Sequence, residues 1–132
     1  MTKVFAVIAI CYVCCSCNQS AKSLKTASSK LQIDALKASS TQFKLLLENE
    51  YVRVLEYSLK PGEKDEPHTH PAKSSYVVSG GRLKIYLENG EVVIANEDAG
   101  TASWRDYVGK HYVENIGNTT VTIVITEIKS MK

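Results

Sequence analysis

Short runs of alternating hydrophobic and polar residues follow one another along the chain from about residue 44 onward. Each run has the period of two that is typical of a half-buried β-strand, and turn residues such as Gly and Pro separate the runs. The strands predicted from this pattern cover residues 44–47, 52–59, 74–79, 82–87, 91–95, 102–105, 111–114 and 119–129. Strands at this regular spacing favour an all-β sandwich or barrel.

The clearest local prediction is a hairpin between residues 82–87 and 91–95. Leu83, Ile85 and Leu87 alternate with polar or amphipathic residues, and Asn89-Gly90 stands between the two runs. Asn-Gly is the favoured pair for a two-residue type I′ turn, in which both residues have positive φ. We therefore expect a type I′ turn at Asn89-Gly90.

The N-terminal residues have a different character. A charged start is followed by an apolar run over residues 4–15, which is shorter than the roughly 20 residues that a membrane-spanning helix needs. This run ends at Ser16-Cys17-Asn18 and resembles a bacterial lipoprotein signal, in which the cysteine is lipidated and becomes the new N-terminus. The alternative is an ordinary signal peptide cut near Ala21. Either interpretation predicts export, and lipidation at Cys17 predicts a protein anchored in the cell envelope.

Composition then divides the rest of the chain. Residues 18–40 are mostly Ser, Lys, Ala, Gln and Thr, which predicts a flexible tether after a signal at residues 1–17, with one helical turn around residues 32–37. The folded domain is expected at residues 41–130. All four cysteines precede residue 18, so no disulfide can stabilise this domain. The net charge of +2, with signs interspersed, excludes a basic surface for nucleic acid.

The histidines are the strongest chemical signal in the sequence. His68 and His70 belong to a His-Thr-His triplet, and alternate residues of a strand point to the same face. His111 lies about forty residues later in another predicted strand. Imidazole is the commonest protein ligand of divalent transition metals. The three side chains form a metal site if their strands face each other across a barrel.

The spacing of these histidines is similar to the two sequence motifs of the cupins. The first motif is matched by Gly62, five residues, His68-Thr69-His70 and later Gly81, and the second by His111, three residues and Asn115. The resemblance covers roughly residues 43–129 and is to the small single-domain cupins. It implies a double-stranded β-helix, which is a double-sheet jelly-roll barrel. Barrels of this kind commonly cover an edge strand with a second copy, so we expect a homodimer.

One departure from the cupin pattern concerns the ligands. In the first motif, three or four residues separate the second histidine from a glutamate, and the corresponding positions of this chain are Ser74 and Ser75. The resemblance therefore implies iron, manganese, nickel or zinc held by His68, His70 and His111 without a carboxylate, as in the three-histidine iron site of the thiol dioxygenases. Such a site leaves coordination positions open for water or substrate.

Four further residues are candidates for the pocket. Tyr76 and Tyr86 lie on strands of which one face lines the predicted barrel, Trp104 is near His111 in the sequence, and Asn115 shares the strand face of His111. Barrel packing or, for Asn115, hydrogen bonding to a turn is the alternative role for each. The acidic run that contains Asp65 is expected to be a solvated loop.

Two classes of function stay open on this basis. One is metal-assisted chemistry on a small polar metabolite, which means oxygen insertion with iron, or isomerisation or hydrolysis with zinc, manganese or nickel. The other is a non-catalytic cupin that binds a sugar or an organic acid without metal. A general acid or base near the metal would separate the two classes, and the sequence shows none.

Overall fold

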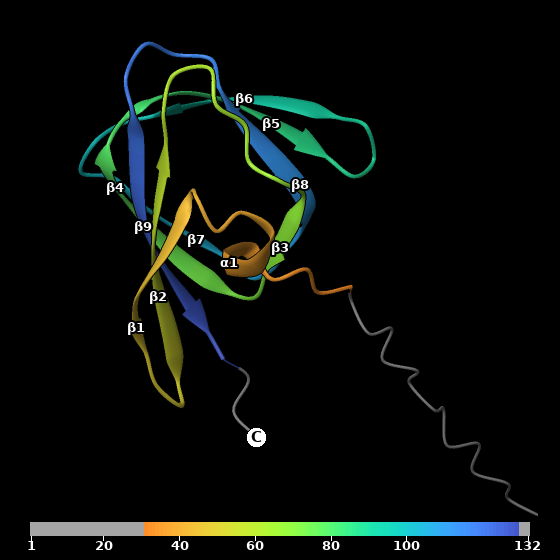
Figure 1. The fold of residues 1–132 in the computed structure, drawn as a ribbon, viewed down its shortest axis with the longest axis vertical. Coiled ribbons are helices and arrows are strands. Elements are labelled where there is room, and N and C mark those ends of the chain that lie inside the picture. The colour runs from red at the N-terminus through yellow and green to blue at the C-terminus, as the bar shows by residue number, and fades with distance from the viewer. Residues whose placement is uncertain (1–30, 130–132) are drawn as a thin grey trace, which may run out of the picture.

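The computed structural model describes residues 31–129, and these form nine strands and one short helix (Figure 1). Each of the eight predicted runs corresponds to one strand, and a short strand at the His-Thr-His triplet is added. Within the described residues, no helix has the length and apolar character needed to cross a bilayer. The elements are α1 (Ala35–Ala38), β1 (Phe43–Glu48), β2 (Val52–Leu59), β3 (His68–His70), β4 (Lys73–Ser79), β5 (Gly81–Leu87), β6 (Val92–Glu97), β7 (Ala102–Arg105), β8 (Val108–Asn115) and β9 (Val121–Ile128).

The strands form two antiparallel sheets that face each other. One sheet has the order β1-β2-β9-β4-β7 and the other the order β3-β8-β5-β6. Side chains from the inner faces of both sheets make one core, because alternate residues of each strand point inward. The buried apolar residues are Ala35, Phe43, Leu55, Tyr57, Leu59, Val77, Leu83, Val113, Val121, Ile123 and Ile125. The predicted all-β barrel of two sheets is thus confirmed.

β9 is the central strand of the larger sheet and shows how the sequence pattern sets the fold. It pairs with β2 on one side and β4 on the other, and every second residue from Val121 onward is buried. Val121, Ile123 and Ile125 supply the apolar part of this row. Glu127 ends it, and this carboxylate is also buried. The inner face therefore changes from apolar to charged along the strand.

The end of the expected tether belongs to the folded domain. Ala35 in α1 is fully buried, and Asp34 forms a parallel bridge with Thr69 in β3. Thr69 holds Ile33 through its side chain, which accepts a hydrogen bond from the Ile33 amide at 2.8 Å. Figure 1 shows α1 beside β3 as a result. The helical turn is confirmed near its expected place, and residues 33–39, which we expected to lie in the tether, contact the domain.

The turn between β5 and β6 differs from the predicted type I′. The strand register pairs Tyr86 with Val92, so three residues, 88–90, lie between the closing residues Leu87 and Glu91. Gly90 has φ +85°, whereas Asn89 and all other described non-glycine residues have negative φ. This is the three-residue loop in which a type I turn is followed by a left-handed glycine. The strand register sets the length of the loop and therefore the type of turn, and the Asn-Gly pair alone does not define that register.

Gly90→Val is expected to destabilise the domain by about 1–2 kcal/mol, because a β-branched residue is strained at positive φ. No other atom lies near the added Cβ, so the effect is one of backbone conformation. Urea unfolding measures the change in free energy. Glu88→Val is the matched control in the same loop at negative φ, and we expect it to stay within about 0.5 kcal/mol of wild type. Equal losses in both variants would contradict this account of the loop.

Candidate metal centre

Pairing of β3 with β8 brings the three histidines together. His68 lies directly opposite His111 in the antiparallel register, and the ring centroids of this pair are 4.5 Å apart. The ring of His70 is 4.8 Å from that of His68 and 5.6 Å from that of His111. One nitrogen of each ring lies within 4.8 Å of the others. The two strands are hydrogen-bonded neighbours in one sheet, and this pairing brings the histidines together without the strands facing each other across the barrel.

Each imidazole is oriented by a hydrogen bond at its Nδ1 atom. His68 donates to the Glu66 carbonyl at 2.7 Å, and His111 donates to the Gly109 carbonyl at 2.8 Å. A carbonyl oxygen only accepts, so in both rings the proton is on Nδ1 and the neutral form leaves a lone pair on Nε2. These two rings therefore present Nε2 as a ligand atom.

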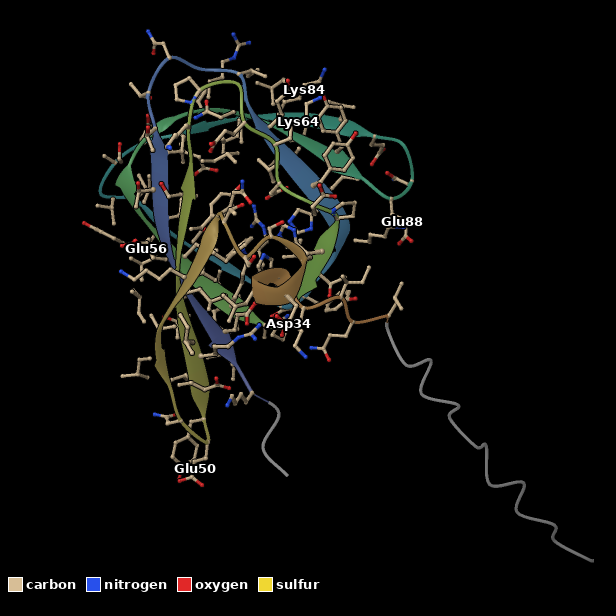
Figure 2. All side chains as sticks on the ribbon, viewed as in Figure 1. Asp34, Glu50, Glu56, Lys64, Lys84 and Glu88 are labelled. Carbon is tan, nitrogen blue, oxygen red and sulfur yellow. The ribbon has the colours of Figure 1, made fainter. Side chains whose placement is uncertain are left out.

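His70 is held by a carboxylate instead of a carbonyl. Its Nδ1 is 2.6 Å from Oε1 of Glu127, and Oε2 of Glu127 accepts from Arg53 at 2.8 Å. Arg53 in turn forms an ion pair with Asp34 at 2.6 Å. Figure 2 shows Asp34 just below α1, so this chain of contacts runs from the N-terminal segment to the histidine. Carboxylates that hold the distal nitrogen of a ligating histidine are common around metal ions.

The protonation of the cluster follows from its burial. Loss of hydration lowers the pKa of His68, lowers that of His70 well below its usual value, and lowers that of His111 to about 4. All three rings are therefore neutral near pH 7. Burial also raises the pKa of Glu127, and Arg53 opposes this shift by stabilising the carboxylate.

The contact between two of the rings has a consequence for ligand chemistry. Nε2 of His68 is 3.1 Å from Nε2 of His70. Because both rings are neutral and carry their proton on Nδ1, two lone pairs face each other at this distance. A cation between them relieves the repulsion. The donor set thus fits a divalent transition metal, which prefers neutral imidazole nitrogen.

The histidines lie at the wall of a cavity of about 330 Å³ between the two sheets. That volume suits a small metabolite. Its wall is apolar where Val77, Leu83, Ile85, Ile123 and Ile125 face one another. The charged residues of the lining are Asp65, Lys73, Glu97 and Arg105.

The comparisons with known proteins bear on this architecture. No protein-family model matches the chain, and no curated protein matches its sequence. Among solved structures, a cupin domain from Bordetella pertussis is 26% identical, with a TM-score of 0.62, over 67% of this chain and 92% of that one. An RmlC-like cupin with a double-stranded β-helix from Methanocaldococcus jannaschii is 16% identical, with a TM-score of 0.54, over 77% and 84%. The chain has the cupin fold.

A third solved structure agrees with this assignment. It is an uncharacterized conserved protein with a double-stranded β-helix domain from Klebsiella pneumoniae, which is 20% identical with a TM-score of 0.51 over 67% of this chain and 84% of that one. All three neighbours support the fold, and the cupin domain from Bordetella pertussis also supports placement in the cupin superfamily.

The fold also settles which serine faces the cupin cavity. Ser75 lines the cavity together with Lys73 and Val77, whereas Ser74 belongs to the opposite face of β4. The glutamate position of the cupin motif therefore corresponds to Ser75. Ser75 carries no ligand charge, so the metal centre of this cupin fold would rest on three neutral donors.

The candidate pocket residues lie outside the cavity lining. Tyr76 is half exposed on the outer face of β4, and Trp104 is half exposed with its indole N–H bonded to Asp106. Tyr86 stacks on Tyr112 with centroids 4.4 Å apart. Lys64 and Lys84 approach the Tyr86 ring at the same outer corner (Figure 2).

Asn115 is buried but structural. Its side-chain amide donates to the carbonyls of Leu59 and Thr119 at 2.7 and 2.8 Å and accepts from the Gly117 amide at 2.9 Å. These bonds close the loop after β8, which was the alternative role expected from the sequence.

Asp65 is the acidic residue that the sequence interpretation misplaced. It is buried, accepts from Tyr57 Oη at 2.8 Å and accepts from the Val113 amide at 2.6 Å. Burial raises its pKa to about 6. The loop before the His-Thr-His triplet is therefore not fully solvated, because Asp65 anchors it to β8. Alternation could not reveal this, since the loop has no regular period.

Ser75→Glu is expected to raise the affinity of the protein for zinc or iron, because it adds a carboxylate on the cavity face of β4. Ser74→Glu adds the same charge on the opposite face and is the matched control, with affinity close to wild type. Competition with a chromogenic chelator measures both affinities. A stronger effect from Ser74→Glu would show that β4 presents the other face to the metal.

Proposed function

We propose that this protein is a metal-binding cupin that acts on or senses a small polar metabolite in its central cavity. Nε2 atoms of His68, His70 and His111 are the proposed ligands of one divalent transition metal. The observation that carries the proposal is the 3.1 Å approach of Nε2 of His68 to Nε2 of His70, in rings whose Nδ1 atoms face other acceptors, so that a cation between the two nitrogens would offset the repulsion of their lone pairs. The bound metal would act as a Lewis acid or a redox centre with open positions toward the cavity.

The hydrogen bonds of the acidic residues near the histidines limit the chemistry that the site can perform. Asp65 uses both carboxylate oxygens to hold Tyr57 and β8, and Glu127 uses both to hold His70 and Arg53. Their contacts suit orientation of the ligands better than proton transfer to a substrate. Two functions therefore fit the site. One is metal-assisted oxygen insertion, isomerisation or hydrolysis, and the other is binding of a ligand without reaction.

Replacement of any one of the three histidines by Ala is expected to reduce bound metal sharply, because two imidazoles bind a divalent ion much less tightly than three. Elemental analysis of protein offered iron, manganese, nickel and zinc in turn measures the loss. Removal of metal from the wild type should lower its melting temperature, since a ligand at a hundredfold excess over its Kd stabilises the native state by about 2.7 kcal/mol.

Glu127→Gln leaves the three proposed metal ligands in place and tests how much the support of His70 contributes to metal affinity. We expect its metal affinity to fall by about ten- to hundredfold, because the charged partner of His70 is lost. Lys44→Met, on the exposed side of β1, is the neutral control.

If the wild type binds none of the four metals above background, a cupin that binds a sugar or an organic acid without metal takes the place of this proposal.

The proposal includes export and a lipid anchor at Cys17. Cys17 lies outside the described residues, and the support is the leader-like sequence that ends at Ser16-Cys17.

We also propose a homodimer, for which the half-exposed Tyr76, Val78 and Trp104 on β4 and β7 offer apolar contact area.

Cys17→Ser is expected to move the protein from the membrane fraction to the soluble exported fraction, because the lipid acceptor is removed. Fractionation of cells that express the full chain, followed by mass measurement of the mature N-terminus, provides the test. Unchanged membrane association with unchanged leader processing would argue against the anchor.

A further inference from the structure

Lys73 places a cation inside the cavity beside the metal centre. The strand register sets Lys73 of β4 between Arg105 of β7 and Glu127 of β9. Lys73 and Arg105 both line the cavity. The charge of Lys73 also contributes to the lowered pKa of each of the three histidines, so its ammonium group lies within electrostatic range of the whole cluster.

This ammonium group has no partner among residues 31–129. It forms no hydrogen bond and no ion pair there. Glu127, its cross-strand neighbour, is occupied by Arg53 and His70. Glu97 attracts Lys73 from across the cavity without direct contact. The Lys73 side chain is partly buried, and this burial lowers the pKa of its ammonium group to about 8, so an anion in the cavity would offset the lost hydration.

The balance of charge inside the cavity also favours an anionic ligand. The two cations of the lining, Lys73 and Arg105, are balanced by the carboxylates of Asp65 and Glu97, and the histidines are neutral. A divalent metal on the histidines therefore brings uncompensated positive charge. Ser75 stands where a carboxylate ligand would have reduced this charge. An anion that enters the cavity restores the balance.

We propose that the ligand is a small organic acid with one carboxylate, which Lys73 binds at the charged end of the cavity with Arg105 beside it. The proposal rests on the proposed function, because it names the ligand class of the same site. The apolar wall of Val77, Ile123 and Ile125 accommodates a short hydrocarbon body, which inorganic phosphate lacks. A cavity of about 330 Å³ limits that body to a few carbon atoms or one ring.

The test compares acids with neutral analogues of the same shape. Acetate, 3-methylbutanoate and benzoate are titrated calorimetrically into the protein, each beside its primary amide, and inorganic phosphate is titrated as the competing anion. Metal-free and zinc-loaded wild-type protein are used in parallel. We expect at least one acid to bind about tenfold or more tightly than its amide in both forms, and more tightly than phosphate.

Lys73→Met separates the lysine from the metal. Methionine keeps an unbranched apolar stem and removes the unpartnered charge, so the variant should melt no lower than wild type. Its affinity for the acid should fall by about tenfold or more, while its zinc content stays unchanged. Lys44→Met, in which the lost cation is exposed on β1, should bind both acid and zinc as wild type does.

Each outcome decides one of the two proposals. Zinc binding with equal acid affinity in wild type and Lys73→Met would overturn the ligand class and leave the metal site standing. Absence of zinc binding, with acid binding that still depends on Lys73, would overturn the metal site and support the carboxylate anchor. Preference for phosphate, or failure of all three acids to bind, would overturn the anchor.

Discussion

Hydrogen bonds at the three Nδ1 atoms control the chemistry of this cavity. They orient the imidazoles of His68, His70 and His111 and leave the lone pairs at Nε2. Without them, each ring could rotate and exchange its tautomer, and the donor atoms would no longer converge. Two of the acceptors are backbone carbonyls, so the arrangement depends on the path of the loop before β3 and of the strand β8.

The third acceptor connects the histidine cluster to the N-terminal segment of the described residues. Glu127 holds His70, Arg53 holds Glu127, and Asp34 contacts Arg53. Asp34 also accepts a hydrogen bond from the Lys37 amide at the start of α1. Residues 34–37 thus belong to the support of one histidine of the cluster. A change in this segment would affect the histidine cluster through ion pairs rather than through the apolar core.

The interior of the barrel contains more charge than stability alone favours. Asp65 and Glu127 offset part of the cost of burial because each accepts hydrogen bonds at both oxygens. Lys73 forms no ion pair within the described residues, and Glu127 and Glu97 attract its charge without direct contact. Groups that cost stability in the native state are concentrated at sites that bind ligands, since the ligand supplies the missing interaction.

The sequence by itself determined the strands and the histidine donors. Alternation over residues 82–87 and 119–129 predicted which side chains point inward, because the period of two is local to each strand. The same alternation, continued from Ile125, placed Glu127 inward, although a carboxylate in an apolar row was not recognised as a support for a ligand. Pairing in tertiary structure decided the rest. Only the register of β3 with β8 shows that His68 and His111 are neighbours, and only the packing of the two sheets shows that Asp65 and Lys73 line the cavity, because these contacts join residues far apart in the chain.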